Sequence, residues 1–312
     1  MAQPELSTNP DALAGADPAR VRLCHVNGTS LYVEVRGSGP ALLLVHAGGE
    51  DAEVWRPIAE RLPDFTVVTY DRRGTLRSGR DNWPGHGSVQ HADDAAAVLE
   101  ALDLGDVVVF GSSSAGIVAL QLALRHPRLI RRALVFEPGL FRQLPGGEAV
   151  QQPVQEASDD YLAAHPDDWT GALGVFRRAV AAMSGANGLL DPPAGRDWYA
   201  TREEIDAEAL VRDDLPILTQ EVVDEGALAS AAVDIRFLFG TGSMPVFRQI
   251  ATHLAALRGS SAIAVDGVGH LIYYHPDAAA AHIRAQAQTE TAEELERVLR
   301  HYPGDLGERR AP

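Results

Sequence analysis

The chain has 312 residues, of which 46% are hydrophobic and only 6% aromatic, so it can bury a sizeable core built mainly from Ala, Val and Leu. Its 27 basic and 43 acidic residues give a formal net charge of −16, which disfavours nucleic acid and anionic membranes as partners. Cys24 is the single cysteine, so no disulfide forms within the chain, and we expect a reducing, cytoplasmic location. Residues 1–20 lack the pattern of a signal peptide and are expected to form a flexible N-terminal arm.

After this arm, short apolar runs alternate with helical patterns. The expected strands are 21–26, 31–35, 41–45, 65–70, 107–110, 133–136, 235–239 and 262–265. The expected helices are 52–61, 91–102, 115–125, 169–183, 202–212, 245–257, 276–289 and 292–301. The turn Asn27-Gly28 predicts a hairpin between the first two strands. Repeated strand–helix units predict an α/β fold with a mostly parallel central sheet flanked by helices.

The alternation of strand and helix patterns stops between residues 139 and 232. This stretch contains several prolines and helical patches but no buried-strand signal. We therefore expect a helical cap, or lid, at 139–232, inserted into a core made of residues 21–138 and 233–312.

The segment around Ser113 carries the strongest chemical signal. An apolar strand at 107–110 runs into Gly111-x-Ser113-x-x-Gly116 and then into a helix. This context favours a nucleophile elbow, in which a serine occupies a tight strand-to-helix turn and the backbone N–H of Ser114 faces a developing oxyanion. Ala115 stands where the pattern has glycine, and a plain serine cap of a helix is the alternative interpretation.

Two histidine-containing loops complete this pattern. His270 follows the strand 262–265 and precedes a helix, which favours it as the general base over His46 and His275. The run His46-Ala47-Gly48-Gly49 follows the buried strand 41–45, and we expect His46 to hold this loop. We expect the Gly48 N–H to be the second oxyanion donor, with Ala47 as the other candidate; a glycine turn without substrate contact is the alternative.

From about Val21 to Thr289 the chain resembles the α/β-hydrolase family. The resemblance is carried by the runs His46-Ala47-Gly48-Gly49, Asp71-Arg72-Arg73-Gly74 with Ser78, Gly111–Gly116, and Gly269-His270 ahead of His275-Pro276. It implies a cofactor-free hydrolase of esters, lactones or related acyl compounds with a cap over the site. Two departures stand out: Leu76 replaces a usual glycine, and Gly242-Ser243 occupy the loop where most relatives carry the aspartate of a catalytic triad.

An acid must then come from elsewhere, and Glu137 is the candidate. Phe136-Glu137-Pro138 resembles a stretch of the zearalenone lactonase branch, which implies Glu137 as the triad acid; a pairing of Glu137 with Arg142 is the alternative. If Glu137 orients His270, its carboxylate should lie about 2.6–3.2 Å from the ring nitrogen that faces away from Ser113. Ser243 should make at most a neutral hydrogen bond.

Other polar and aromatic residues carry weaker signals. The pairs Asp93-Asp94 and Asp213-Asp214 are expected at helix caps or on solvated faces. We find no metal-ligand spacing and no phosphate-binding loop, and expect no cofactor. In the cap, Trp169, Trp198 and Tyr199 either line a substrate pocket or form the cap's own core.

The sequence thus predicts a serine hydrolase with a Ser113–His270–Glu137 triad, acting on a small, apolar ester or lactone. Carbon–carbon bond hydrolysis or another acyl transfer on the same triad is one alternative. A weakly active ligand-binding module is another, and a homodimer remains open as the assembly.

Overall fold

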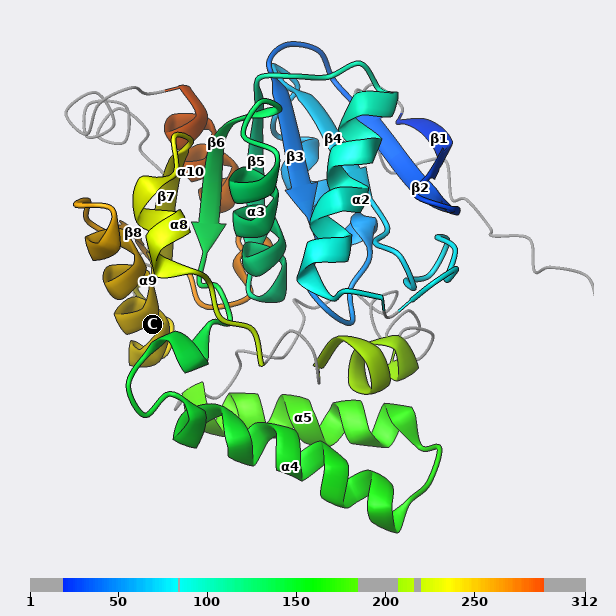
Figure 1. The fold of residues 1–312 in the computed structure, drawn as a ribbon, viewed down its shortest axis with the longest axis vertical. Helices are drawn as coiled ribbons and strands as arrows, with labels where there is room; N and C mark the ends of the chain where they lie inside the picture. Colours follow the sequence, from blue (N-terminus) through cyan, green and yellow to red (C-terminus); the bar gives the residue numbers. More distant parts are fainter. Residues whose placement is uncertain (1–18, 84, 185–206, 216–219, 289–312) are drawn as a thin grey trace, which may run out of the picture.

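The computed structural model describes residues 19–83, 85–184, 207–215 and 220–288 (Figure 1). Within them, eight strands form one sheet in the order β1-β2-β4-β3-β5-β6-β7-β8. The strands are β1 (Arg20–Val26), β2 (Thr29–Arg36), β3 (Ala41–Val45), β4 (Thr66–Tyr70), β5 (Val107–Ser112), β6 (Ile130–Phe136), β7 (Asp234–Gly240) and β8 (Ile263–Val265).

The predicted hairpin is present at one edge of the sheet. Strands β1 and β2 pair antiparallel from Arg20↔Val35 to Val26↔Thr29. The connecting residues Asn27 and Gly28 have φ values of 47° and 75°, as a two-residue hairpin turn requires. Strand β2 also pairs antiparallel with β4, whereas all pairings from β4 to β8 are parallel. The predicted α/β class with a mostly parallel sheet is confirmed.

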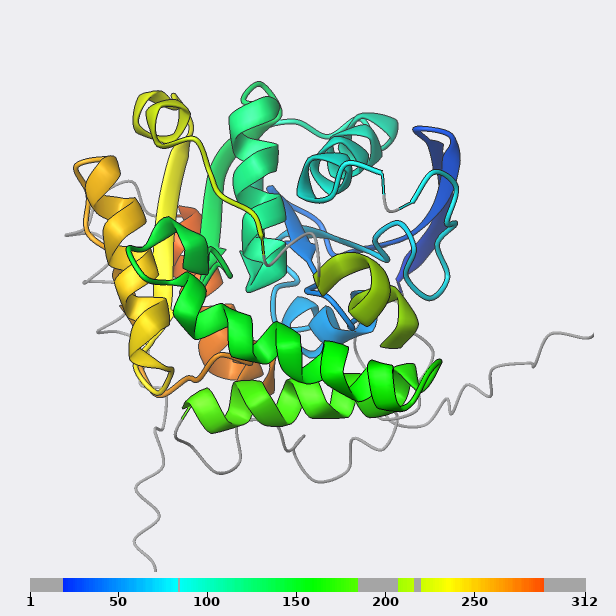
Figure 2. The ribbon, with the colours of Figure 1, turned by 60° about the horizontal axis from the view of Figure 1, so that its bottom comes forward.

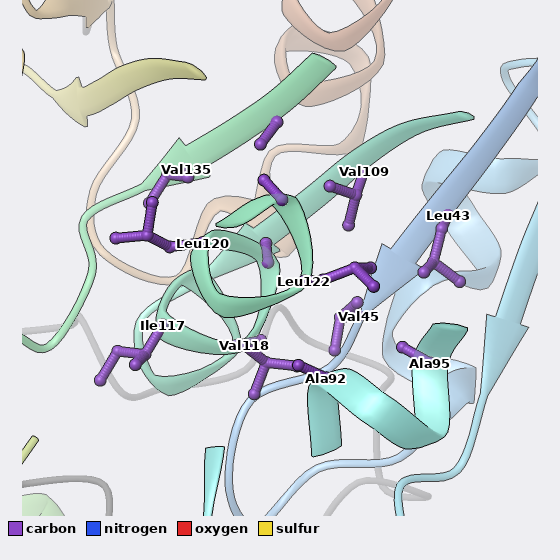
Figure 3. Close-up of a cluster of buried hydrophobic side chains, with 14 of the residues drawn as sticks. Leu43, Val45, Ala92, Ala95, Val109, Ile117, Val118, Leu120, Leu122 and Val135 are labelled. Atoms are coloured by element: carbon purple, nitrogen blue, oxygen red, sulfur yellow. The ribbon is translucent and has the colours of Figure 1, made fainter. Parts of the chain in front are cut away.

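Helices cover both faces of the sheet because the side chains of the central strands alternate between two apolar cores. Leu43, Val45 and Val109 point to the face covered by α2 (Ser88–Ala101) and α3 (Ser114–Arg125), as Figure 3 shows. On the same face lie α8 (Glu225–Ser230) and α9 (Pro245–Leu257). Leu42 and Leu44 belong to the opposite core, with α1 (Arg56–Ala59) and α10 (Pro276–Gln288).

The described part of 139–232 contains helices and no strand. Its helices α4 (Glu148–Ala164) and α5 (Trp169–Ser184) lie side by side beyond the carboxyl ends of β3 and β6 (Figures 1 and 2). With the π-helix η3 (Ala209–Asp214) they form a separate apolar cluster that includes Ala172, Leu173 and Leu210. Helix α8 is not part of this cluster and packs on α9. The role of the stretch as a lid stays a prediction.

The helices differ from the sequence pattern in several places. The expected helix 52–61 is divided into the 3₁₀-helix η1 (Ala52–Trp55) and α1. The pattern did not indicate α4, whose sequence is largely polar and carries Pro153 inside the helix. The 3₁₀-helices η2 (Phe141–Gln143) and η4 (Ile272–Tyr274) were also not expected.

Some predictions fall on other parts of the chain. The N-terminal arm up to residue 18, the first part of the helix 202–212 and the helix 292–301 lie outside the described residues. Among the described helices, none combines the length and apolar character needed to cross a membrane.

Candidate active site

Ser113 occupies a tight turn between β5 and α3. Its backbone has φ 55° and ψ −124°, a conformation that costs a non-glycine residue roughly 1–3 kcal/mol and is typical of functional turns. A Cβ added at Gly111 would lie 2.2 Å from the carbonyl oxygen of Ala115, so this close backbone approach requires glycine. The methyl group of Ala115 is buried in the core below α3, which explains why the turn tolerates alanine there.

The sheet register brings Glu137 beside this turn. Ser112 pairs with Phe136 at the ends of β5 and β6, so Ser113 and Glu137 leave adjacent strands at the same level. The Ser113 N–H donates to the Phe136 carbonyl at 3.0 Å. Glu137 has a positive φ of 45°, so two non-glycine residues in the left-handed region stand next to each other.

Glu137 is hydrogen-bonded to His270. The Glu137 Oε2 atom lies 2.7 Å from His270 Nδ1, and Oε1 accepts the Gly240 N–H at 2.7 Å. Both oxygens of this fully buried carboxylate are therefore engaged. The predicted contact between Glu137 and His270 is present, and it implies that Nδ1 carries a proton while Nε2 remains as the proton acceptor.

The alternative pairing of Glu137 with Arg142 is not observed. Arg142 pairs with Glu148 at 2.9 Å and not with Glu137. The Ser243 hydroxyl, at the usual position of the acid, has no hydrogen-bond partner within the described part of the chain. Glu137 is thus the carboxylate that contacts His270.

The His270 ring is also held by an aromatic neighbour that the sequence pattern did not reveal. Phe247, at the start of α9, stacks on it with 4.1 Å between ring centroids and an interplanar angle of 10°. Phe247 is buried and contacts Phe141, with centroids 5.6 Å apart. The stack fixes the plane of the imidazole, whose side chain keeps 13% exposure, and His275 lies outside this group as an exposed residue.

The glycine loop after β3 contacts the elbow directly. The Gly48 N–H donates to the Ser114 hydroxyl at 2.9 Å. The Ala47 N–H is instead engaged by the Glu50 carboxylate at 3.0 Å, which leaves Gly48 as the better placed of the two predicted donors.

His46 holds this loop, as expected. Its Nδ1 donates to the Ala47 carbonyl and its Nε2 accepts the Arg72 N–H, both at 2.8 Å. Burial, reinforced by the positive charge of Arg72, keeps the pKa of His46 well below its usual value, so the ring stays neutral.

Helix η3 packs against the glycine loop. A Cβ added at Gly48 would lie 2.5 Å from Leu210 Cδ1, and one at Gly49 would lie 2.7 Å from Leu210 Cδ2. Gly49 also has a φ of 72°. The absence of side chains at Gly48 and Gly49 therefore lets η3 of the cap approach the candidate oxyanion site.

A buried polar cluster joins the same cap helix to the core. Arg72 Nη2 lies 2.6 Å from Asp214 Oδ2, and His91 Nε2 lies 3.5 Å from Asp214 Oδ1. Arg73 likewise forms two 2.7 Å hydrogen bonds with the fully buried Asp94. The expectation that Asp94, Asp213 and Asp214 lie at caps or on solvated faces is wrong, because all three are buried. Asp94 and Asp214 each face an arginine from the loop after β4.

The predicted aromatic residues of the cap have different outcomes. Trp169 packs against the cap's own apolar cluster, as its interpretation as cap core requires. Trp198 and Tyr199 lie outside the described residues. Within the described ranges, no group of three or more His, Cys, Asp or Glu side chains is arranged to hold a metal ion.

Comparison with known proteins places this geometry in a family. The family model of the α/β hydrolase fold matches residues 40–195, which is half of the chain. The chain belongs to the α/β-hydrolase family. A solved α/β hydrolase from Sphaerobacter thermophilus superposes with a TM-score of 0.66 at 25% identity, over 86% of this chain and 100% of its own.

Two further proteins are similar to the chain over different spans. The uncharacterized hydrolase YraK of Bacillus subtilis is 42% identical over 128 residues, which are 40% of this chain and 47% of YraK. The chain thus matches less than half the length of this curated relative. The solved structure of Est816, described as an N-acyl homoserine lactone degrading enzyme, has a TM-score of 0.60 at 21% identity and covers 86% of this chain and 99% of its own.

The structure also explains one departure from the α/β-hydrolase pattern. Leu76 replaces a usual glycine and has a φ of 31°, within the left-handed region. The backbone there keeps the conformation that favours glycine, and leucine adopts it at a conformational cost of about 1–2 kcal/mol.

Proposed function

We propose that this chain is a serine hydrolase that cleaves uncharged esters or lactones through an acyl-enzyme. Ser113 is the nucleophile, His270 the general base and Glu137 the acid that orients His270. The backbone N–H groups of Gly48 and Ser114 stabilise the oxyanion. The resemblance of Phe136-Glu137-Pro138 to the zearalenone lactonase branch supports this position of the acid.

In the first half-reaction, Ser113 Oγ bonds to the acyl carbon and its proton passes to His270 Nε2. The carbonyl electron pair moves onto oxygen, and the oxyanion accepts hydrogen bonds from Gly48 and Ser114. Collapse of this intermediate breaks the bond to the leaving oxygen, which takes the proton from His270. Water then attacks the acyl-enzyme with His270 again as the base, and the acid product leaves.

The observation that carries the proposal is the Glu137–His270 hydrogen bond of 2.7 Å beside the strained Ser113 turn. A buried carboxylate on Nδ1 fixes the tautomer in which Nε2 accepts a proton, and it offsets the charge of the imidazolium that forms. A binding module would have no need for either feature. The contact therefore favours catalysis over the weakly active alternative.

Apolar neighbours support an uncharged acyl substrate. Leu210 of the cap lies against Gly48, and Phe247 lies against His270. The nearby Asp214 carboxylate is already paired with Arg72, so neither residue offers an unpaired charge for an ionic group. The description of Est816 supports including acyl lactones, and we propose that the cap at 139–232 encloses the acyl chain.

Labelling with a fluorophosphonate probe tests the mechanism, followed by a panel of p-nitrophenyl esters and acyl lactones. We expect the wild-type protein to be labelled at Ser113 and to hydrolyse members of the panel. Ser113→Ala should lose both labelling and turnover while keeping the folded circular dichroism spectrum. An unlabelled wild-type protein, or undiminished activity of Ser113→Ala, would contradict the proposed function.

A further inference from the structure

The side chain of Ser114 lies between the elbow and the glycine loop. Its Oγ accepts the Gly48 N–H at 2.9 Å, across the gap between α3 and the loop after β3. Ser113, Ser114 and Gly48 are all partly exposed, whereas the flanking Ser112 and Ala47 are buried. This hydrogen bond is therefore made at a place that a substrate can reach.

Ser114 Oγ occupies the acceptor position of the Gly48 N–H, one of the two proposed oxyanion donors. An oxyanion is expected about 2.7–3.1 Å from a donor, and Ser114 Oγ lies 2.9 Å from the Gly48 nitrogen. In the free protein, the Ser114 hydroxyl thus accepts the Gly48 N–H, which the proposed reaction needs as an oxyanion donor. A substrate oxygen that binds the Gly48 N–H must replace this hydroxyl or share the donor with it.

The glycine loop does not depend on Ser114 for its shape. The His46 ring ties it to the Arg72 backbone, Glu50 holds the Ala47 N–H, and Leu210 packs over Gly48. Nor does Ser114 cap α3, because the N-cap is Ser113. Neither the loop nor the helix therefore depends on the Ser114 hydroxyl for its structure.

We propose that the Ser114 hydroxyl is a third hydrogen-bond donor to the oxyanion. A hydroxyl can both accept and donate. In the free protein Oγ accepts from Gly48; when the acyl oxygen takes over the Gly48 N–H, the side chain rotates and donates its O–H to that oxygen. The inference rests on the proposed function, since it assigns Ser114 a second contact to the same oxyanion, and no proton leaves Ser114.

The test compares Ser114→Ala with Ser114→Thr, which retains a hydroxyl, and with Ser112→Ala as the matched control in the same turn. Hydrolysis of p-nitrophenyl butyrate gives kcat and KM, and an alkyl trifluoromethyl ketone, which forms an oxyanion on the serine, reports affinity for the intermediate. Removal of one oxyanion donor should lower kcat on the order of 10²- to 10³-fold. We expect this loss in Ser114→Ala, with an equal loss of ketone affinity and little change in KM.

Ser114→Thr should recover most of the lost kcat and ketone affinity, and Ser112→Ala should match the wild type. The inference is overturned if kcat/KM rises in Ser114→Ala, because the hydroxyl would then only obstruct the Gly48 N–H. It is also overturned if ketone affinity is unchanged, or if Ser114→Thr is as impaired as Ser114→Ala. Fluorophosphonate labelling of the wild type separates the two proposals. If the wild type is labelled and one of the overturning results is obtained, only the role of Ser114 is refuted. If the wild type is not labelled, the proposed function is refuted as well.

Discussion

Both carboxylate oxygens of Glu137 are hydrogen-bonded, and these two contacts determine the expected effect of a substitution at this position. Oε2 contacts His270 and Oε1 accepts the Gly240 N–H, each at 2.7 Å. Glu137→Gln keeps the size of the side chain but removes the negative charge, and its amide cannot accept at both positions. The His270 ring then loses the partner that fixes its tautomer and offsets its developing charge.

We therefore expect Glu137→Gln to lower kcat on the order of 10⁴-fold, as loss of the triad acid does in serine proteases. Ser243→Ala should change kcat by less than about threefold, because its hydroxyl has no hydrogen-bond partner within the described residues. Steady-state kinetics on p-nitrophenyl esters measures both. A severe effect of Ser243→Ala together with a mild effect of Glu137→Gln would show that the acid lies elsewhere.

At the scale of elements, the pair Arg72–Asp214 connects the loop after β4 to η3. Both side chains are nearly or fully buried, and the Arg72 Nε and Nη1 atoms have no hydrogen-bond partner in the described ranges. Burial alone would raise the pKa of Asp214, but Arg72 and His91 outweigh it and hold this pKa below its usual value. Removal of one partner leaves the other as an uncompensated buried charge.

Arg72→Met alone should therefore lower the free energy of unfolding by about 3–5 kcal/mol, and Asp214→Leu alone by a similar amount. The double variant should lose much less than the sum, because it replaces the pair by apolar side chains. Urea denaturation measures all three. The exposed pair Arg142–Glu148 supplies the control, and Arg142→Ala should cost at most about 1 kcal/mol. Additive losses from Arg72→Met and Asp214→Leu would show that the pair does not couple cap and core.

The local run of apolar residues was sufficient to predict the central strands, because each of them is buried on both faces. Residues 41–45 were predicted as a strand, and β3 has these same bounds. The contacts of Asp214 could not be predicted in this way, because Arg72 is 142 residues away and only the docked cap brings them together. For Glu137, the sequence left two interpretations open, and the β5–β6 register separates them by setting Glu137 beside the elbow.

At the scale of the whole molecule, buried histidines couple the fold to pH. His46, in the loop after β3, and His91, in α2, are almost fully buried. Burial, and then the charge of Arg72, lowers the pKa of both rings. Against this, Asp214 raises the pKa of both, and Asp94 raises that of His91, but the net direction for each ring is downward. In the unfolded chain the same rings take up a proton near their ordinary pKa of about 6.5.

The sign of the pH dependence follows from this difference. Below about pH 6.5 the unfolded state binds more protons than the folded state, so the free energy of unfolding falls as pH falls. Between pH 7 and 5, His46 should contribute a loss of at most about 2 kcal/mol, the limit for a ring that takes up its proton only in the unfolded state. The lowered pKa values of Asp214 and Glu34 act in the same direction, but only below about pH 4, where their stabilising contribution is lost.

Urea denaturation at pH 7, 6 and 5 checks this prediction, with His46→Gln as the comparison. The variant loses stability at every pH, since Gln cannot reproduce both hydrogen bonds of the ring, so the slope against pH is the informative quantity. The free energy of unfolding should change less steeply with pH in His46→Gln than in the wild type, by up to the contribution of one proton. Equal slopes in wild type and His46→Gln would mean that His46 is protonated to the same extent in the folded and unfolded states, contrary to its burial against Arg72.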